Sequence, residues 1–204
     1  DTVLGGILAE LPSGITGTVI GTGMYLSSAN PFNVEVVEDD LMRVMQSSVN
    51  DATRLPNQCK HGYIVKVSNS RMADEDDYYV RFDGENDRDG AGSWSECAKP
   101  GIPKTLTNMP LVIQRTALAN QGTSTEIATF TIKQFTYADR EIGDELTNPL
   151  PSFVTKRINK VLFFRNRLVF LSGENVITSR PGTLGEPDFF SESALTISSS
   201  DPID

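Results

Sequence analysis

Reactive side chains are scarce in this sequence of 204 residues, which contains two cysteines, one histidine and one tryptophan. Cys59 and Cys97 are too few for a disulfide framework and do not have the spacing of metal ligands. Each lies beside a predicted strand, so the two could meet in the fold. The simpler interpretation is that both cysteines are free thiols in a protein made in a reducing cytoplasm.

Because His61 is the single histidine, any Ser–His or Cys–His catalytic scheme would depend on it alone. It precedes Gly62 at the start of a predicted strand, where we expect a structural role. The sequence has no G-x-S-x-G motif and no phosphate-binding glycine loop. We therefore predict that the protein is not an enzyme, with no catalytic residues, no cofactor and no cofactor-binding residues. A pair of glycosidase-type carboxylates stays open, because acidic residues are numerous and sequence does not give their separation.

Long apolar runs are also missing from the chain. None approaches the ~18 residues that a membrane span requires. No signal-peptide pattern is present either. Because the first residue is Asp and the chain stops at Asp204 with no tail, we expect the sequence to be a piece of a longer protein.

The net charge of -9 is unevenly distributed. Residues 1–100 contain 8 Lys and Arg against 16 Asp and Glu, whereas residues 101–204 contain 10 against 11. Duplex DNA is bound mainly by basic groups that displace counterions, so the acidic first half argues against a site that grips nucleic acid. It is compatible with a surface that DNA slides past, and equally with acidity that serves solubility alone.

Hydrophobic periodicity predicts a protein that is mainly β with some α (α+β), with antiparallel sheets and meanders and one N-terminal helix. The helix is predicted because Val3, Leu4, Ile7, Leu8 and Leu11 fall on one helical face. Gly5 and Gly6 each cost up to ~1 kcal/mol inside a helix, so this one needs tertiary packing. Alternation of apolar and polar residues then predicts strands over residues 32–36, 63–67, 78–82 and 130–132.

One acidic stretch nearly reproduces the spacing of a calcium-binding loop. Its candidate ligands are Glu85, Asp87, Asp89 and Glu96, with Gly90 at the turn. The flanking residues, however, predict strands rather than the helices that such a loop joins. A solvated hairpin tip is the preferred interpretation, and we predict no metal site. The acidic run over residues 74–77 is interpreted in the same way, as surface charge.

Glycine and proline residues mark a boundary between Pro100 and Asn120. We divide the chain there into a helix plus antiparallel β domain over residues 1–110, and a β-meander or propeller-like segment over residues 111–204. The second segment is expected to be incomplete.

Three short apolar runs, over residues 161–164, 168–171 and 176–178, predict a meander in the second segment. Such a meander has the size of one propeller blade and is too small to be stable alone. Its edges therefore need neighbours, either from missing chain or from a partner subunit. Part of an ordinary β-sandwich remains an open alternative. Phenylalanines able to anchor either a core or an interface accompany it: Phe153, Phe163, Phe164 and Phe170.

A series of short motifs in the second half occurs in a characteristic order. The motifs are Tyr137-Ala138-Asp139-Arg140, Gly143-Asp144, Asn148-Pro149, Pro151-Ser152-Phe153, Phe163-Phe164, Asn166-Arg167-Leu168, Phe170-Leu171-Ser172, Ser179, Phe189-Phe190 and Asp201-Pro202-Ile203-Asp204. In this order they resemble the tail nozzle proteins (tail tubular protein B) of short-tailed bacteriophages. Shorter matches in the first half, such as Asp77-Tyr78-Tyr79-Val80, resemble the same family.

The resemblance implies a structural part of the virion. Members of the family form a hexameric ring, the nozzle that closes the tail below the portal and gatekeeper rings and through which DNA is ejected. The implied partners are identical copies, the gatekeeper ring and the tail fibres, with DNA passing through the lumen without specific binding. The implied location is the virion tail, after synthesis in the host bacterial cytoplasm. Two other hypotheses stay open at this point: a β-rich module that binds carbohydrate or protein, with or without structural calcium, and a cell-wall glycosidase.

Overall fold

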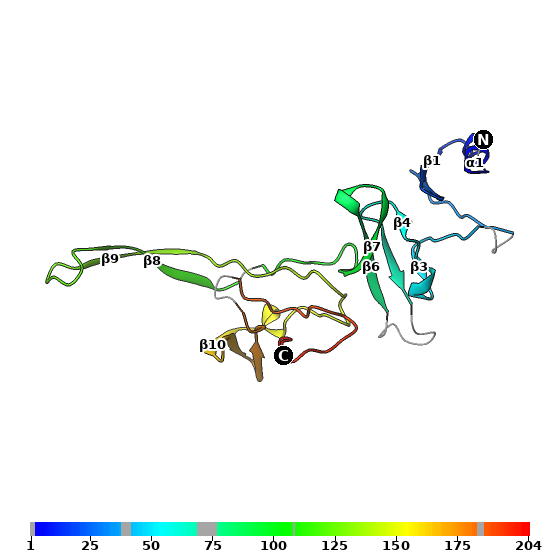
Figure 1. Cartoon of the computed structure of the whole chain (residues 1–204). Coiled ribbons are helices and arrows are strands. Elements are labelled where there is room, and N and C mark those ends of the chain that lie inside the picture. Colours follow the sequence, from blue (N-terminus) through cyan, green and yellow to red (C-terminus); the bar gives the residue numbers. More distant parts are fainter. Residues whose placement is uncertain (1–2, 38–41, 69–76, 108, 183–185) are drawn as a thin grey trace. The chain divides into compact units, whose positions relative to one another are not determined.

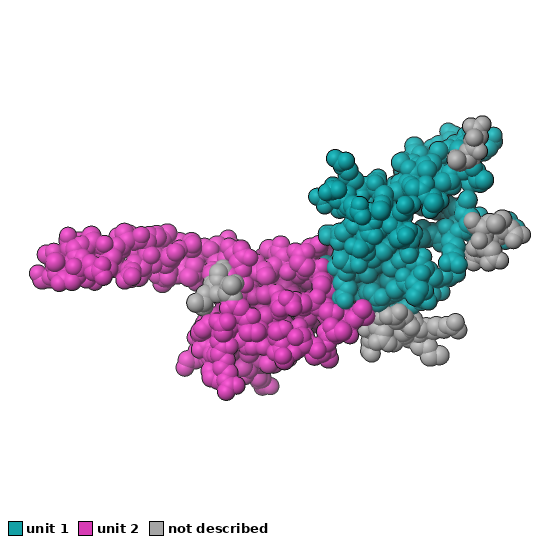
Figure 2. Space-filling view, in the orientation of Figure 1, with its two compact units in different colours: residues 1–100 teal, residues 101–204 magenta. Residues whose placement is uncertain are grey.

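The computed structural model describes residues 3–37, 42–68, 77–107, 109–182 and 186–204. The chain forms two compact units, Asp1–Pro100 and Gly101–Asp204 (Figure 2). Antiparallel strands dominate both units, and the first begins with an α-helix, which confirms the predicted mainly β fold with some α (Figure 1). Within the described residues, no helix has the length and apolar character of a membrane span.

The N-terminal helix packs on a β-hairpin. Leu8 and Leu11 lie directly over Gly17, where an added Cβ would stand 2.5 and 2.8 Å from their methyl groups. No residue of the helix is buried, so the contact with the hairpin supplies the tertiary support that its glycines require. The elements are α1 (Val3–Ala9), β1 (Ile15–Ile20) and β2 (Gly23–Ser28).

A five-stranded sheet in the order β3-β5-β6-β7-β4 makes up the rest of unit 1. Its central strands confirm the predictions for residues 63–67 and 78–82, because Val65, Val80 and Phe82 are all buried. Trp94 packs edge-to-face on Phe82, at 5.2 Å between ring centroids. The strands are β3 (Ser48–Val49), β4 (Gln58–Cys59), β5 (Ile64–Val67), β6 (Tyr78–Gly84) and β7 (Gly90–Cys97).

Two expectations for unit 1 are wrong. Residues 31–37 form no strand, and Phe32 and Val37 are exposed. Alternation alone does not make a strand, because a strand needs a neighbour that pairs with its backbone groups. The acidic run was expected at the surface, but Asp77 is 3% exposed and its carboxylate lies 2.6 Å from the Lys66 ammonium. Asp77 is buried because it leads into β6 beside β5; the rest of that run, residues 74–76, lies outside the described residues.

Unit 2 contains a long hairpin and the predicted three-stranded meander. The meander is confirmed, and a tight turn joins its first two strands, with Arg165 and Asn166 in the left-handed region at φ 47° and 62°. That the meander is a propeller blade, and that residues 111–204 are an incomplete domain, stay predictions. The strands are β8 (Leu111–Ala119), β9 (Ile127–Gln134), β10 (Ile158–Phe164), β11 (Arg167–Ser172) and β12 (Asn175–Thr178).

The core of unit 2 is an aromatic cluster drawn largely from loops. Phe153, Phe170 and Phe189 pack against one another with ring centroids 4.9 to 5.2 Å apart. Only two of the buried members lie on strands, one on β11 and one on β12. The cluster consists of Leu106, Met109, Tyr137, Phe153, Phe170, Ile177, Phe189 and Phe190.

A buried arginine ties these loops together. The Arg140 side chain is fully buried, and its guanidinium donates hydrogen bonds to three backbone carbonyls, those of Pro103, Asp144 and Asn148. It also lies over the ring of Phe190, 5.5 Å from the centroid. Each carbonyl belongs to an irregular segment with few ladder hydrogen bonds of its own. Arg140 therefore replaces the regular secondary structure that these segments lack.

We expect Arg140→Met to destabilise unit 2 by at least ~3 kcal/mol, because it leaves several buried carbonyls without donors. The measurement is the free energy of unfolding in urea. Arg157→Met is the matched control: Arg157 is exposed, so its replacement should change stability by no more than about 0.5 kcal/mol. Equal losses in the two variants would contradict the role of Arg140.

Candidate assembly surfaces

The β8–β9 hairpin, here called the arm, exposes one apolar face. The strand register places Ile113 opposite Ile132, and Arg115 opposite Phe130. Residues two apart on a strand share a face, so Leu111 belongs to the same side. The four large apolar side chains of this face are 59 to 67% exposed: Leu111, Ile113, Phe130 and Ile132. In Figure 2 the arm extends as a narrow projection from the rest of unit 2.

The opposite face of the arm is polar along most of its length, with the exposed Ile127 at the end toward the tip. Gln114 pairs with Thr131, and Thr116 Oγ1 lies 3.4 Å from Thr131 Oγ1. Lys133 stands on this side as well, opposite Val112. The arm is therefore an amphipathic sheet of two strands, and such a sheet normally covers its apolar face. The burial pattern of β9 is exposed at every position, so nothing in the described residues covers that face.

A second apolar surface lies at the edge of the meander. Strand β10 pairs only with β11 in the order β10-β11-β12. Its apolar run projects past the core, and its side chains are 37 to 60% exposed: Val161, Leu162, Phe163 and Phe164. An apolar edge strand of this kind is a surface that associates with other chains unless it is covered.

The structure separates the four phenylalanines that the sequence left ambiguous. Phe153 and Phe170 are buried in the aromatic cluster, whereas Phe163 and Phe164 are 52 and 60% exposed. Sequence reasoning placed a strand at residues 130–132 but missed that its apolar face is uncovered. One signal in the sequence could have indicated an uncovered face. The opposite face of the hairpin carries Thr116, Thr129 and Thr131, and no third alternating strand lies next to the hairpin in sequence.

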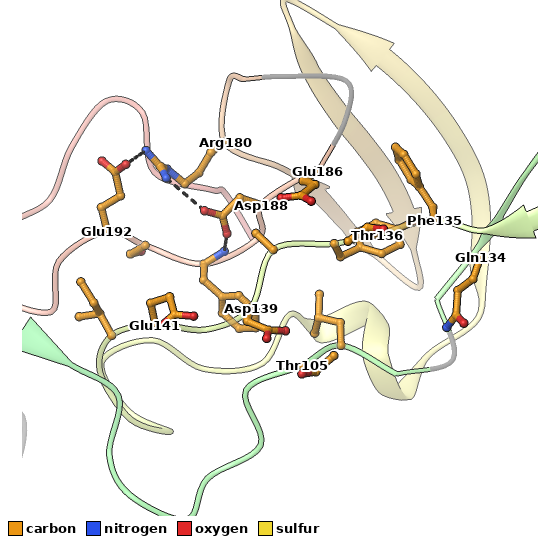
Figure 3. A pocket seen from close by; sticks show the side chains of 16 residues that line it. Thr105, Gln134, Phe135, Thr136, Asp139, Glu141, Arg180, Glu186, Asp188 and Glu192 are labelled. Carbon is orange, nitrogen blue, oxygen red and sulfur yellow. Dashed lines mark hydrogen bonds and ion pairs between the residues drawn. The ribbon is translucent and has the colours of Figure 1, made fainter. Parts of the chain in front are cut away.

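An acidic groove of about 810 Å³ lies at the base of the arm (Figure 3). Arg180 holds two of its carboxylates, by an ion pair with Glu192 and another of 3.1 Å with Asp188. Asp188 also accepts a hydrogen bond of 2.8 Å from the backbone N–H of Phe190. These contacts fix the loop over residues 186–192 against the core. The charges of Arg180, Asp188 and Glu192 in this groove therefore hold the loop in place.

Two carboxyl groups with shifted pKa values do not have the property that the glycosidase hypothesis requires. A glycosidase needs one carboxyl group whose pKa is raised so that it can act as an acid. The shifts at Asp51 and Asp83 both lower the pKa. The backbone N–H of Thr53 lowers the pKa of Asp51, and hydrogen bonds from Ser95 and Arg81 lower that of Asp83.

The structure does not gather the calcium-loop candidates. Glu85 and Asp87 lie in a 3-10 turn at the tip of the β6–β7 hairpin. Glu96 pairs with Val80. It lies four residues along β7 from Gly92, which pairs with Gly84 next to the tip, so roughly 13 Å separates Glu96 from that pair. Asp89 accepts a hydrogen bond of 2.9 Å from the backbone N–H of His61. No group of three potential ligands for a metal ion occurs among the residues that the structure describes.

The remaining candidates are structural. His61 Nδ1 accepts a hydrogen bond of 3.2 Å from the backbone N–H of Gly84, which confirms its structural role. Cys59 and Cys97 are free thiols, and burial raises the pKa of the Cys59 thiol. Cys59 lies opposite Gly90, seven residues from Cys97 along β7, so roughly 23 Å separates the two cysteines. A disulfide requires Cα atoms within about 7 Å, so these cysteines cannot form one.

Comparison with known proteins identifies the class to which this β-rich chain belongs. The family model of the bacteriophage nozzle protein matches residues 8–204, so the chain belongs to the bacteriophage nozzle protein family. The chain is thus part of a bacteriophage nozzle protein. The chain is similar to tail tubular protein gp12 of Escherichia phage T7, with 35% identity over 168 residues. That match covers 81% of this chain but 19% of the relative, so the chain spans about a fifth of the relative's length.

The resemblance stated from the sequence is confirmed, and the motifs that carried it have structural positions. Tyr137 and Phe189 belong to the aromatic cluster, and Arg140 is its polar clamp. The closing motif is also bound in place, because the Asp204 carboxylate accepts hydrogen bonds of 2.5 Å from the backbone and hydroxyl of Ser152. Arg167 donates a hydrogen bond of 2.8 Å to the Asp201 carbonyl. Most of the family motifs therefore hold the scaffold, whereas the Phe163-Phe164 motif is exposed.

Replacement of Phe163 should cost far less stability than replacement of a core ring. We expect Phe163→Ala to lower the free energy of unfolding by less than ~1 kcal/mol, and Phe170→Ala to lower it by ~3–5 kcal/mol. Denaturant melts of both variants provide the comparison. A loss for Phe163→Ala as large as that for Phe170→Ala would place Phe163 in the core instead of on an exposed surface.

Burial raises the pKa of the Tyr137 hydroxyl from 10.0 to about 12. The folded state then holds this proton more tightly than the unfolded chain does. The resulting stabilisation is fully present below about pH 10 and is lost as the pH rises to about 12. Tyr137→Phe should therefore lessen the fall in unfolding free energy across this window, measured by urea melts between about pH 9 and about pH 12. An equally steep fall in the variant would contradict a buried hydroxyl.

Proposed function

We propose that this chain is part of a non-enzymatic nozzle subunit whose whole protein forms a six-fold ring, the conduit through which phage DNA leaves the particle. The single observation that carries the proposal is the family match over residues 8–204. It is supported by two uncovered apolar surfaces, the face of the arm and the edge of β10, which a subunit of an assembly would use for contacts.

The non-enzymatic role rests on how the polar groups are used. Three buried polar side chains, those of Arg140, Asp144 and Asn148, hydrogen-bond to the backbone of neighbouring residues. In the acidic groove, Arg180 forms one ion pair with Asp188 and another with Glu192. Such contacts stiffen a scaffold, and each of these polar groups already has a hydrogen-bond or ion-pair partner within the protein.

The partners that we propose are further copies of the protein, the gatekeeper ring above the nozzle and the tail fibres. DNA would pass through the lumen without specific binding. The excess of acidic groups in residues 1–100, 16 against 8 basic ones, suits a surface that does not hold DNA. Synthesis in the host bacterial cytoplasm fits the two free thiols.

The test is the oligomeric state of the whole protein. Mass photometry together with class-averaged electron images should show closed rings of six subunits. The same measurement on the Phe170→Ala variant shows how a folding defect affects ring formation, because that change damages the core of unit 2 and leaves the exposed surfaces unchanged. A wild-type protein that is folded and remains monomeric at micromolar concentration would contradict the proposed ring.

A further inference from the structure

We propose that the apolar face of the arm packs onto the β10 edge of a second copy of the chain, so that neighbouring subunits are joined head to tail. This inference rests on the proposed ring and specifies which surfaces form its contact. The donor surface consists of Leu111, Ile113, Phe130 and Ile132. The acceptor surface is one face of the β10 edge, Val161 with Phe163 or Leu162 with Phe164, because alternate residues of a strand share a face.

The two surfaces match in length. The apolar face of the arm extends over five positions, from the Leu111–Gln134 pair to the Arg115–Phe130 pair, and the apolar run of β10 extends over four, residues 161–164. At ~3.3 Å per residue, the two stripes are roughly 16 and 13 Å long. An arm laid along β10 would therefore extend over the length of its exposed run.

Their combined area also matches one interface. From the exposed fractions, the donor leaves ~500 Å² uncovered and one face of β10 leaves ~200 Å², taking about 200 Å² for a large apolar residue. A little more than half of an ordinary interface is apolar, so about 700 Å² of apolar area corresponds to a contact of about 1,200 Å². That is the lower end of the standard size of a stable protein–protein interface.

Head-to-tail packing explains both surfaces at once. A ring needs two different surfaces on each subunit, one that meets the preceding copy and one that meets the following copy. In the described structure the arm's own β10 does not cover it, since both surfaces are exposed in the same unit. Packing onto a second copy's β10 covers both surfaces.

Packing of two arms against each other fits less well. Arg115 stands on the apolar face itself, at the end toward the tip of the hairpin, opposite Phe130. Two arms face to face would bring two such guanidinium groups into one desolvated contact, which is costly for like charges. The acceptor run over residues 161–164 carries no charge, and arm-to-arm packing would leave it exposed.

Nucleic acid is not the ligand that this face fits. The arm, residues 111–134, contains Arg115, Lys133 and Glu126 as its charged groups, a balance of one positive charge. Binding to DNA phosphates would require several more basic groups on the exposed side. The large exposed side chains of the face are aliphatic and aromatic, which suits another protein surface.

The experiment is photocrosslinking in the whole protein with p-benzoylphenylalanine in place of Phe130. Copies labelled with heavy and light nitrogen are mixed, assembled and irradiated, and crosslinked peptides are identified by mass spectrometry. The expected crosslink joins residue 130 of one copy to the 158–166 segment of another. The same replacement at Ile132 is a second probe, and at Thr131, on the polar face, it is the matched control that should lack this crosslink.

Each other result has a defined meaning. Crosslinks to another arm, to the same copy, to DNA or to a different protein would overturn the proposal, as would rings that form and yield no crosslink from either probe. In those cases rings in electron images would leave the six-fold nozzle itself standing. Absence of any oligomer would instead overturn the proposed ring, and the contact with it.

Discussion

Unit 2 depends on one buried positive charge. Arg140 is fully buried, and burial lowers the pKa of its guanidinium, yet the group is bound by three carbonyl acceptors, one at Pro103 and two, Asp144 and Asn148, in its own loop. A buried guanidinium is tolerated only when its donors are satisfied, so each of these loops is restricted to the geometry that satisfies it. The aromatic cluster then packs on segments whose backbones are already fixed. This explains how a unit with little regular structure outside its hairpin and meander still has a defined core.

The exposed surfaces depend on this rigidity. The arm begins two residues after Met109 and ends just before Phe135; Met109 is a member of the aromatic cluster and Phe135 packs against it. Both ends of the hairpin are therefore held by the core, while its strands are uncovered. Strand β10 has the same arrangement: its partner β11 supplies Phe170 to the core, and β10 itself projects past it. A stable core positions two apolar surfaces that the unit does not cover itself.

Sequence patterns predicted the strands well wherever local chemistry determines them. The alternation at residues 63–67 and 78–82 and the meander after Ile158 were all found, because their turn residues and apolar periods are local signals. The strand at residues 32–36 was not found, since pairing depends on a neighbour that the pattern cannot show. Burial was harder still. Asp77 was expected at the surface and is buried, and Phe163, which the sequence left open between core and interface, is exposed, because burial is decided by contacts distant in sequence.

The family signature and the assembly surfaces are largely different sets of residues, and this difference has a physical basis. Core residues such as Phe153 and Arg140 are constrained from all sides, so a motif built from them is recognisable in sequence. The side chains on the apolar face of the arm are constrained on one side only, by the surface against which they pack. A surface of this kind needs the right pattern and length, and it gives little local signal of its own. The residues that identify the chain are therefore those that hold the scaffold, and the residues available for contact were evident only once their exposure was known.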